Sequence, residues 1–293
     1  MGGSGAARTT PEYVSRISPE VQAFSHWTEP VGTLGAIVAE AKIRAEALES
    51  RRSELESACS NAPSRASLRA ALRQPAVGLL AEVKRRSPSK GAIAEGLDAV
   101  EQAHAYAAGG AAGVSILTEP AHFGGSIEDL LDVGRRVALP ILKKDFHVAP
   151  IQLVEARALG ASAALLIARA LAPDRLAEMM RIGHALGLEL LVEVRDEAEL
   201  ERALAEGATM IGVNNRDLET LIIDLATSDR LLPRIPPHVV AIAESGVKTR
   251  GDVERYAAVG ADAVLVGSSL SASSDPVAAT RALAGVPRRQ RAG

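Results

Sequence analysis

Charged side chains stand at the ends of short apolar runs in this sequence. The run AVGLLA (76–81) passes directly into EVKRRSPSKG, which puts a carboxylate (Glu82) and an ammonium group (Lys84) at the end of a segment typical of a buried strand. Residues two positions apart in a strand share a face, so these two groups lie together. Burying an unpaired charge is costly, and a strand that ends in charge therefore indicates a ligand site.

Six further apolar runs end in ionisable, amide or hydroxyl groups. Any one of them could be a solvated strand end, or an ion pair that only ties strands together. Seven such ends favour a single site, because the ends of parallel strands in a barrel meet on one rim. The residues are Ser115, Glu119, Lys143, Lys144, Glu193, the four residues 214–217, Glu244, Ser245, Ser268 and Ser269.

A fourfold repeat identifies the elements that must position these residues. GGAAGVSIL, LGASAALLI, EGATMIGV and VGADAVLVG each show a helical stretch that ends at glycine, then alanine, then an apolar run. The glycines are Gly110, Gly160, Gly207 and Gly260, so the steps are 50, 47 and 53 residues. Glycine suits the left-handed position that ends a helix. One more strand candidate lies in each interval and one before the first, at 140–146, 188–194, 239–245 and 78–84.

Eight strands that alternate with helical segments predict a parallel sheet, since each crossover needs a helix. Runs such as AALLI and AVLV are apolar throughout, as expected for strands buried on both faces. We therefore predict an α/β protein with a closed (β/α)8 TIM barrel. An open doubly wound sheet is the alternative, but the glycine-rich dinucleotide turn is missing after the first strand.

The last two strand ends, ESG (244–246) and VGSS (266–269), are short turns rich in backbone N–H groups and hydroxyls. Further on, Ser274 or Asp275 is expected to cap a helix with Pro276 at its first position. Loops after the seventh and eighth strands, with a short helix N-terminus, commonly bind phosphate in this fold. The pattern predicts a phosphorylated small-molecule substrate.

The N-terminal part predicts a helical extension at about residues 34–74. One amphipathic helix carries an apolar stripe, and a short second helix follows in RASLRAALRQ. We expect one barrel domain over residues 31–285 that includes these helices, a disordered tail over 1–30, and a solvated basic tail over 286–293. The stripe consists of Leu34, Ile37, Val38, Ala41, Ala45, Leu48 and Leu55.

Composition excludes several classes of partner. Proteins bind nucleic acid through basic surfaces, so the formal net charge of −3 argues against a nucleic-acid partner. Cys59 is the only cysteine, so no internal disulfide or cysteine metal cluster is expected, and a cytoplasmic location fits. Neither a signal peptide nor an apolar run long enough for a membrane helix is found. No histidine cluster has metal-ligand spacing, and we expect no metal.

Together the motifs resemble the indole-3-glycerol-phosphate synthase family, the ring-closing lyases of tryptophan biosynthesis. The resemblance covers about residues 33–285. It implies conversion of 1-(2-carboxyphenylamino)-1-deoxyribulose 5-phosphate to indole-3-glycerol phosphate, with release of carbon dioxide and water and without a cofactor. The motifs, in the family's order, are EVKRRSPSKG, SILTEPAHFGGS, LKKDF, LVEV, GVNNRDL, AESGV and VLVGSSL.

The resemblance also implies roles. Lys144 matches the family's general acid and Glu193 its base, with Glu82, Lys84 and Asn214 as further catalytic residues. We expect neighbouring positive charge, from Lys84, Lys143 and Arg216, to lower the pKa of Lys144 toward the working pH. The implied substrate-binding residues are Ser87, Arg216, Glu244, Ser245, Gly246, Leu265, Gly267 and Ser268.

Other functions stay open at this point. Another phosphate-binding barrel enzyme, such as a phosphoribosylanthranilate isomerase or a Schiff-base aldolase that uses Lys144, would share much of the pattern. A barrel that only binds phosphosugars, or acts as a scaffold, has no use for Glu193 facing Lys144 across the mouth. Contact with other tryptophan-pathway enzymes is a further possibility.

Overall fold

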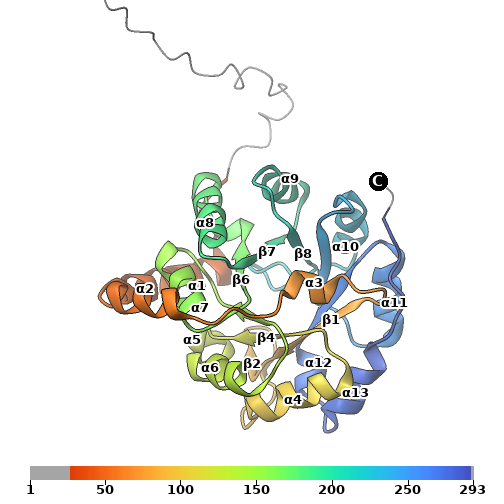
Figure 1. Ribbon diagram of the computed structural model, residues 1–293. Coiled ribbons are helices and arrows are strands. Elements are labelled where there is room, and N and C mark those ends of the chain that lie inside the picture. Colours follow the sequence, from red (N-terminus) through yellow and green to blue (C-terminus); the bar gives the residue numbers. More distant parts are fainter. Residues whose placement is uncertain (1–26, 292–293) are drawn as a thin grey trace, which may run out of the picture.

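Eight parallel strands close into a barrel in the computed structural model, which describes residues 27–291 (Figure 1). The strand order is β1-β10-β9-β8-β7-β6-β5-β4, and β1 pairs with both β10 and β4. This closure confirms the predicted TIM barrel and rules out the open sheet. The strands are β1 (Gly78–Val83), β4 (Gly113–Leu117), β5 (Ile141–Lys144), β6 (Ala163–Ile167), β7 (Glu189–Val194), β8 (Met210–Asn214), β9 (Val240–Glu244) and β10 (Ala263–Val266).

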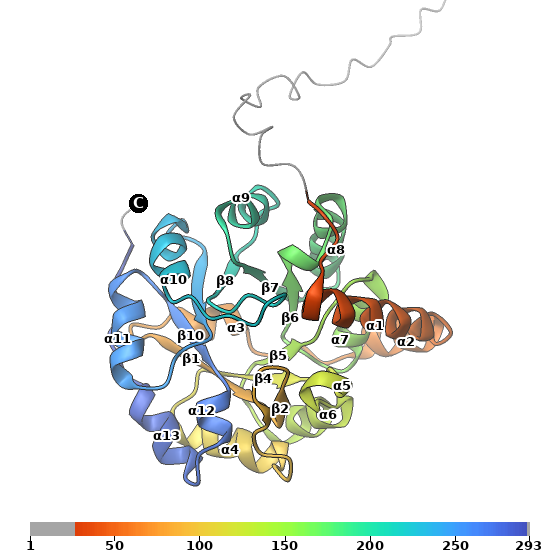
Figure 2. The same ribbon diagram turned by 180° about the vertical axis from the view of Figure 1, so that it is seen from behind.

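Helices surround the barrel, as both end-on views show (Figures 1 and 2). Side chains that accept from backbone N–H groups cap several of them, as Asp98, Asp196 and Thr249 do. None of the helices between residues 27 and 291 is long and apolar enough to span a membrane. The outer helices are α4 (Ala99–Gly109), α6 (Ile127–Arg136), α7 (Pro150–Ala158), α8 (Pro173–Ala185), α9 (Glu197–Ala205), α10 (Ala226–Leu231), α11 (Arg250–Ala258) and α13 (Pro276–Leu283).

Short elements lie between strands and outer helices. After β1 comes a small antiparallel hairpin of β2 (Arg86–Ser87) and β3 (Gly91–Ala92). Two short helices follow β4 and β10, namely α5 (Pro120–Phe123) and α12 (Ser268–Ser271). Single 3-10 turns form η2 (Ala168–Ala170) and η3 (Leu232–Arg234).

The four repeated glycines have the predicted backbone conformation. Their φ angles are +96° at Gly110, +80° at Gly160, +78° at Gly207 and +98° at Gly260. Residues with a Cβ rarely adopt this conformation, which turns the chain from a helix into the next strand. The repeat therefore has a physical cause at each of its four positions.

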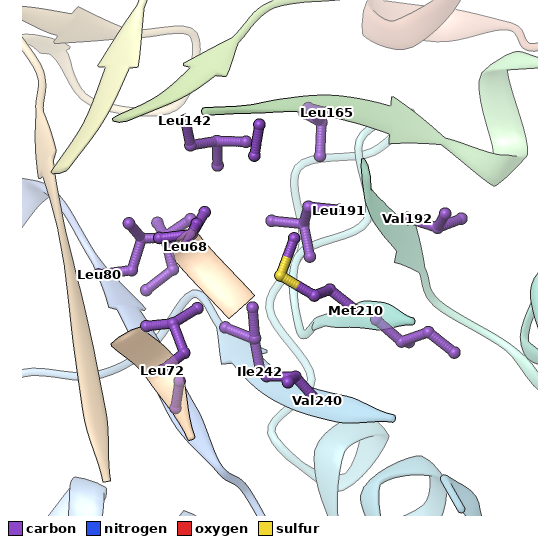
Figure 3. Close-up of a cluster of buried hydrophobic side chains, with 14 of the residues drawn as sticks. Leu68, Leu72, Leu80, Leu142, Leu165, Leu191, Val192, Met210, Val240 and Ile242 are labelled. Carbon is purple, nitrogen blue, oxygen red and sulfur yellow. The ribbon is translucent and has the colours of Figure 1, made fainter. Parts of the chain in front are cut away.

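The barrel interior is filled by every second residue of the strands. Leu68 and Leu72 of α3 (Leu68–Leu72) are fully buried and lie against it at the amino-terminal end (Figure 3). The backbone N–H of Arg69 donates to the carboxylate of Glu189, at the start of β7, at 2.9 Å. Helix α3 therefore closes this end of the barrel. The strand residues in the cluster include Leu80, Leu142, Leu165, Leu191, Met210 and Ile242.

The N-terminal extension contains two helices, α1 (Gly32–Glu49) and α2 (Arg52–Asn61), where we predicted one. The chain turns at Ser50 and Arg51, and α2 then packs on α7. Leu55 of α2 and Ala45 of α1 form a small separate core with Ile151 and Val154 of α7. A straight helix would carry Leu55 past α7, so the turn keeps the whole apolar stripe buried.

The prediction of a solvated basic tail is wrong for Arg288 and Arg291, whereas Arg289 and Gln290 between them are exposed. Arg288 and Arg291 each make an ion pair of 2.8 Å with Asp262, and only 4% of the Arg291 side chain is exposed. Asp262 is buried, and a buried carboxylate requires charged partners. Residues 292 and 293, and residues 1–26 of the predicted disordered tail, lie outside the part of the chain that the structure describes.

Candidate active site

A cavity of about 390 Å³ opens at the carboxyl ends of the strands, opposite α3. All thirteen residues that the sequence singled out for catalysis or substrate binding line it. Alternation explains the strand residues among them, because the residue two positions beyond each buried barrel layer points into the mouth, and the others lie in the loops that follow the strands. The residues are Glu82, Lys84, Ser87, Lys144, Glu193, Asn214, Arg216, Glu244, Ser245, Gly246, Leu265, Gly267 and Ser268.

Lys144 lies on the floor of this cavity among three carboxylates. Its Nζ atom is 3.6 Å from Glu193 Oε2, 3.7 Å from Glu244 Oε2 and 4.0 Å from Glu82 Oε2. These groups come from β5, β7, β9 and β1, so the barrel closure brings them together. Asn214 of β8 donates from Nδ2 to Glu193 Oε1 at 2.9 Å and fixes that carboxylate.

The expected lowering of the Lys144 pKa is wrong. Burial alone would lower the pKa of Lys144, but Glu193, Glu244 and Glu82 outweigh it, and the pKa is raised above its ordinary value. Lys143 does not supply the expected positive charge, since alternation turns it to the outer face of β5. There it pairs with Glu155 at 3.0 Å. Lys144 is therefore a cation through the neutral range.

The carboxylates of the cavity differ in protonation. Burial and the charge of Glu193 raise the pKa of Glu244 to about 8, although Lys144 acts against this. Burial also acts to raise the pKa of Glu82, but Lys84 and Lys144 outweigh it and lower the pKa. Lys84 Nζ is 2.5 Å from Glu82 Oε1. The site thus favours Glu82 as a carboxylate, whereas Glu244 binds a proton more readily than an ordinary glutamate.

Two glycines make room for these acids inside the barrel. A Cβ atom at Gly212 would lie 2.0 Å from Glu244 Oε1, and one at Gly267 would lie 2.5 Å from Glu82 Oε1. Gly212 was not among the predicted site residues. The signal was present in the sequence, because a glycine inside a strand such as MIGV often marks the close approach of another group.

Replacing Gly212 by alanine should therefore displace Glu244. We expect kcat/KM to fall by about 10²-fold, since a shift of roughly 1 Å among positioned groups can cost that much. Gly251→Ala is the matched control, because its Cβ meets only Thr249 Oγ1 at 3.7 Å on the outside of α11. Steady-state kinetics of both variants test this, and unchanged kcat/KM in Gly212→Ala would contradict it.

One side of the cavity is apolar. The rings of Phe123 and Phe146 lie with centroids 6.0 Å apart, and Lys84 Nζ lies 5.9 Å from the Phe123 centroid. Leu165 and Ile167 of β6 complete this wall. Strand β6 (AALLI) ends without a polar residue, and an apolar wall of this kind is what an aromatic ligand needs.

The opposite side is formed by the turns after β9 and β10. Ser245 has a φ of +64° and Gly246 a φ of +96°, so this turn presents its backbone to the cavity. The helix beside it is α12, which begins at Ser268. We had expected α13 there, but α13, although capped by Asp275 as predicted, does not line this cavity. The turns offer N–H groups and hydroxyls to an anion.

One polar strand end supports a neighbouring helix and does not line the cavity. Glu119 accepts from the backbone N–H groups of Ala121, His122 and Phe123 and so caps α5. Glu40 and His122 place ligand atoms within 4.8 Å of the Glu119 carboxylate, but Arg44 already lies 3.6 Å from it. A guanidinium in that position competes with any metal ion.

A buried charge network lies behind the mouth, on the outer face of β5. His147 Nε2 lies 3.4 Å from Lys143 Nζ, and its Nδ1 donates to the backbone oxygen of Leu165 at 2.8 Å. Burial and the charge of Lys143 lower the pKa of His147 to about 3. Asp145 also faces Lys143. Burial acts to raise the pKa of Asp145, but Lys143 and His147 outweigh it, and the pKa is lowered.

This network predicts a loss of stability in acid. Between pH 6.5 and about 3 the unfolded His147 binds a proton that the folded one does not, so the free energy of unfolding decreases as the pH falls. The slope from this residue is at most about 1.4 kcal/mol per pH unit. We expect His147→Asn to flatten the pH dependence and exposed His104→Asn to leave it unchanged. Urea unfolding at several pH values measures both.

Comparison with known proteins agrees with this geometry. Residues 34–283 match the family model described as indole-3-glycerol phosphate synthase. The chain belongs to this family. Indole-3-glycerol phosphate synthase of Rhodococcus jostii is 50% identical over 222 residues, or 76% of this chain and 82% of the relative. The Mycobacterium avium enzyme of the same name is 49% identical over 78% of this chain and 84% of its own.

Solved structures outside the indole-3-glycerol phosphate synthases support the fold alone. Thiamine phosphate pyrophosphorylase from Pyrococcus furiosus superposes with a TM-score of 0.54 at 18% identity, covering 74% of this chain and 96% of its own. The family match confirms the resemblance that the motifs indicated, and with it a decarboxylating lyase of tryptophan biosynthesis. It also decides against the isomerase, aldolase and scaffold alternatives.

Proposed function

We propose that the chain closes the indole ring of 1-(2-carboxyphenylamino)-1-deoxyribulose 5-phosphate, with Lys144 as the general acid and Glu193 as the general base. The observation that carries this assignment is the Lys144 ammonium group, which lies within 4.0 Å of three carboxylates on the floor of the cavity. Family membership supports the reaction. The roles of the individual residues are those that the family resemblance implies, and the distances in the cavity support them.

The first step is ring closure. The aromatic carbon that bears the substrate carboxylate attacks the ketone, and the ketone oxygen takes a proton from Lys144. A raised pKa suits this role, because Lys144 keeps its proton at neutral pH until an alkoxide, a far stronger base, forms beside it. The carboxylate then leaves as carbon dioxide, and its bonding electrons restore the aromatic ring.

The second step is loss of water from the ring-closed alcohol. The hydroxyl group leaves with a proton from an acid, while a base removes a proton from the intermediate. Glu193 serves as the base, with its orientation set by the hydrogen bond from Asn214. Lys84 and Glu82 are paired at 2.5 Å, and this pair holds the departing hydroxyl in position.

The walls of the cavity orient the substrate. The phosphate lies in the turns that contain Ser245, Gly246, Gly267 and Ser268, with Ser87 and Leu265 completing that end. The aromatic ring lies against the apolar wall on the other side. Its carboxylate faces Lys84, Asn214 and Arg216, and Glu244 hydrogen-bonds a sugar hydroxyl.

A direct assay tests the proposal. Purified protein in a chelator is incubated with the carboxyphenylamino-deoxyribulose phosphate, and the appearance of indole fluorescence and carbon dioxide is followed. We expect one carbon dioxide for each indole-3-glycerol phosphate formed. Absence of both products, or a substrate adduct on Lys144 that borohydride traps, would contradict the proposal, since the adduct is the signature of a Schiff-base aldolase.

A cytoplasmic location is also part of the proposal, supported by the single cysteine, Cys59, which cannot form an internal disulfide. Contact with other enzymes of the tryptophan pathway stays a prediction. Cell fractionation tests the location, and co-purification with the tagged full chain tests the contact.

A further inference from the structure

One ion pair joins three distant segments at the rim of the mouth. Arg169, in η2 after β6, donates from Nη2 to Glu219 Oε1 at 2.6 Å and from Nη1 to the backbone oxygen of Thr28 at 2.6 Å. Glu219 lies in the loop after β8. The same Glu219 oxygen accepts from the backbone N–H of Val31 at 3.1 Å. Figure 2 shows the start of α1 beside this loop.

Glu219 provides α1 with the cap that its own sequence lacks. No side chain of α1 caps its N-terminus, where Val31 stands, although the first N–H groups of a helix need partners. Besides binding Val31, Glu219 accepts from the N–H of Thr33 through its backbone oxygen at 3.3 Å. Gly32 has a φ of +59°, and a Cβ there would lie 2.6 Å from the Glu219 backbone oxygen. The contact is too close for any side chain.

The joined segments are walls of the main cavity. Thr33 and Ile37 of α1 line it on one side of the junction, and Arg216 and Leu221 line it on the other. Arg216 donates from Nη1 to the backbone oxygen of Leu221 at 3.0 Å, and Leu221 has a φ of +65°. A loop in this conformation needs support from outside. The contact with α1 supplies it.

The junction also closes a second, smaller cavity of about 100 Å³ behind the catalytic base. Glu193 and Asn214 form its inner wall, and Arg169 and Glu219 form its outer wall. The ion pair therefore lines the same cavity as the reacting groups, and no hydrogen bond or ion pair joins it to Glu193 or Asn214.

We propose that Arg169 and Glu219 are positioning residues that form a latch, which holds α1 and the loop after β8 over the mouth and thereby sets substrate affinity. This inference rests on the proposed function. The latch acts through Arg216, which contacts the substrate carboxylate before and during ring closure. An interaction that is equal in the ground and transition states changes KM and leaves kcat nearly constant.

Variants of Glu219 test the latch directly. Glu219→Ala removes the acceptor shared by Arg169 and Val31, and we expect KM to rise about tenfold with kcat within about twofold of the wild type. Glu219→Gln keeps an oxygen that both donors can reach, so it should restore most of the affinity. Glu254→Ala is the matched control, because it breaks an exposed pair with Arg250, of 3.0 Å, on α11, which packs on α13 and β10.

Gly32→Ala reaches the same junction from the other side. Its Cβ would force the start of α1 away from Glu219 while both latch side chains stay present. We expect the same rise in KM, and a double variant with Glu219→Ala no worse than the stronger single variant, because both break one contact. Additive effects would overturn the proposal.

Amide hydrogen exchange separates this proposal from the proposed reaction. Faster exchange over residues 31–37 in Glu219→Ala and Gly32→Ala, measured without substrate, supports the latch whether or not the wild type turns over the substrate. Wild-type turnover tests the reaction alone. Unchanged KM and unchanged exchange in both variants overturn the latch, and so does a fall in kcat at constant KM. If Glu219→Ala does not fold, Gly32→Ala carries the test.

Discussion

Replacing Lys144 by methionine is expected to lower kcat by about 10³-fold or more, with a much smaller change in KM. Methionine keeps most of the volume but cannot donate a proton to the ketone oxygen. The three acidic side chains within 4.0 Å of Nζ would also lose their cation, and the negative charge that they carry would oppose any alkoxide formed beside them. Single-turnover kinetics under saturating substrate measure the chemical step directly.

Lys143→Met is the matched control, since Lys143 is the adjacent residue on the same strand and faces outward. It is buried and pairs with Glu155 at 3.0 Å and Asp145 at 3.4 Å. Breaking a buried ion pair costs about 3–5 kcal/mol, so both lysine variants should lower the melting temperature. Only Lys144→Met should abolish turnover. Equal losses of kcat in the two variants would show that stability, and not proton donation, is responsible.

Glu193→Gln is expected to reduce kcat by about 10²- to 10⁴-fold, the usual contribution of a positioned general base. Glutamine keeps an oxygen that accepts from Asn214 Nδ2, at present 2.9 Å from the carboxylate, so the side chain should hold its position. What is lost is the ability to take a proton. The measurement is kcat of the variant and of the wild type under saturating substrate.

The control for this variant is Glu199→Gln, which lies in the first turn of the following helix, α9. Burial, together with Asp196, raises the pKa of Glu199 to about 7, so glutamine resembles a form that is already populated at neutral pH. Its carboxylate accepts from the backbone N–H of Arg195 at 2.8 Å, a bond that glutamine can also accept. We expect near wild-type kinetics. Near-normal turnover in Glu193→Gln itself would reject the assignment of the base.

The fold could be predicted because its signals are local. Each of the four repeated glycines ends a helix by its own backbone conformation, and each strand carries an apolar run of buried residues. The position of the site followed from the same pattern, since polar residues at the ends of parallel strands must meet. Both predictions needed only two periodic patterns. One is the two-residue alternation of side chains along a strand, and the other is the repeat of glycines about every fifty residues.

What could not be predicted depends on partners far away in the sequence. The pKa of Lys144 is set by carboxylates from three other strands, and the sequence does not show how many of them reach it. The same holds for Arg291. Its partner Asp262 directly precedes β10, and only the folded barrel brings the two residues together. The break between α1 and α2 is another case, because Leu55 turns back only to meet α7.

The neighbouring lysines of β5 have a consequence for how this protein can evolve. Inside and outside are decided by one step along the strand, so an added residue near the start of β5 would move Lys143 into the position in the mouth that Lys144 now holds. Lys144 would then lie one position farther along the strand, on the outer face. A chain with lysine at both positions keeps a cation in the cavity through such a slip, whereas one with a single lysine would lose it.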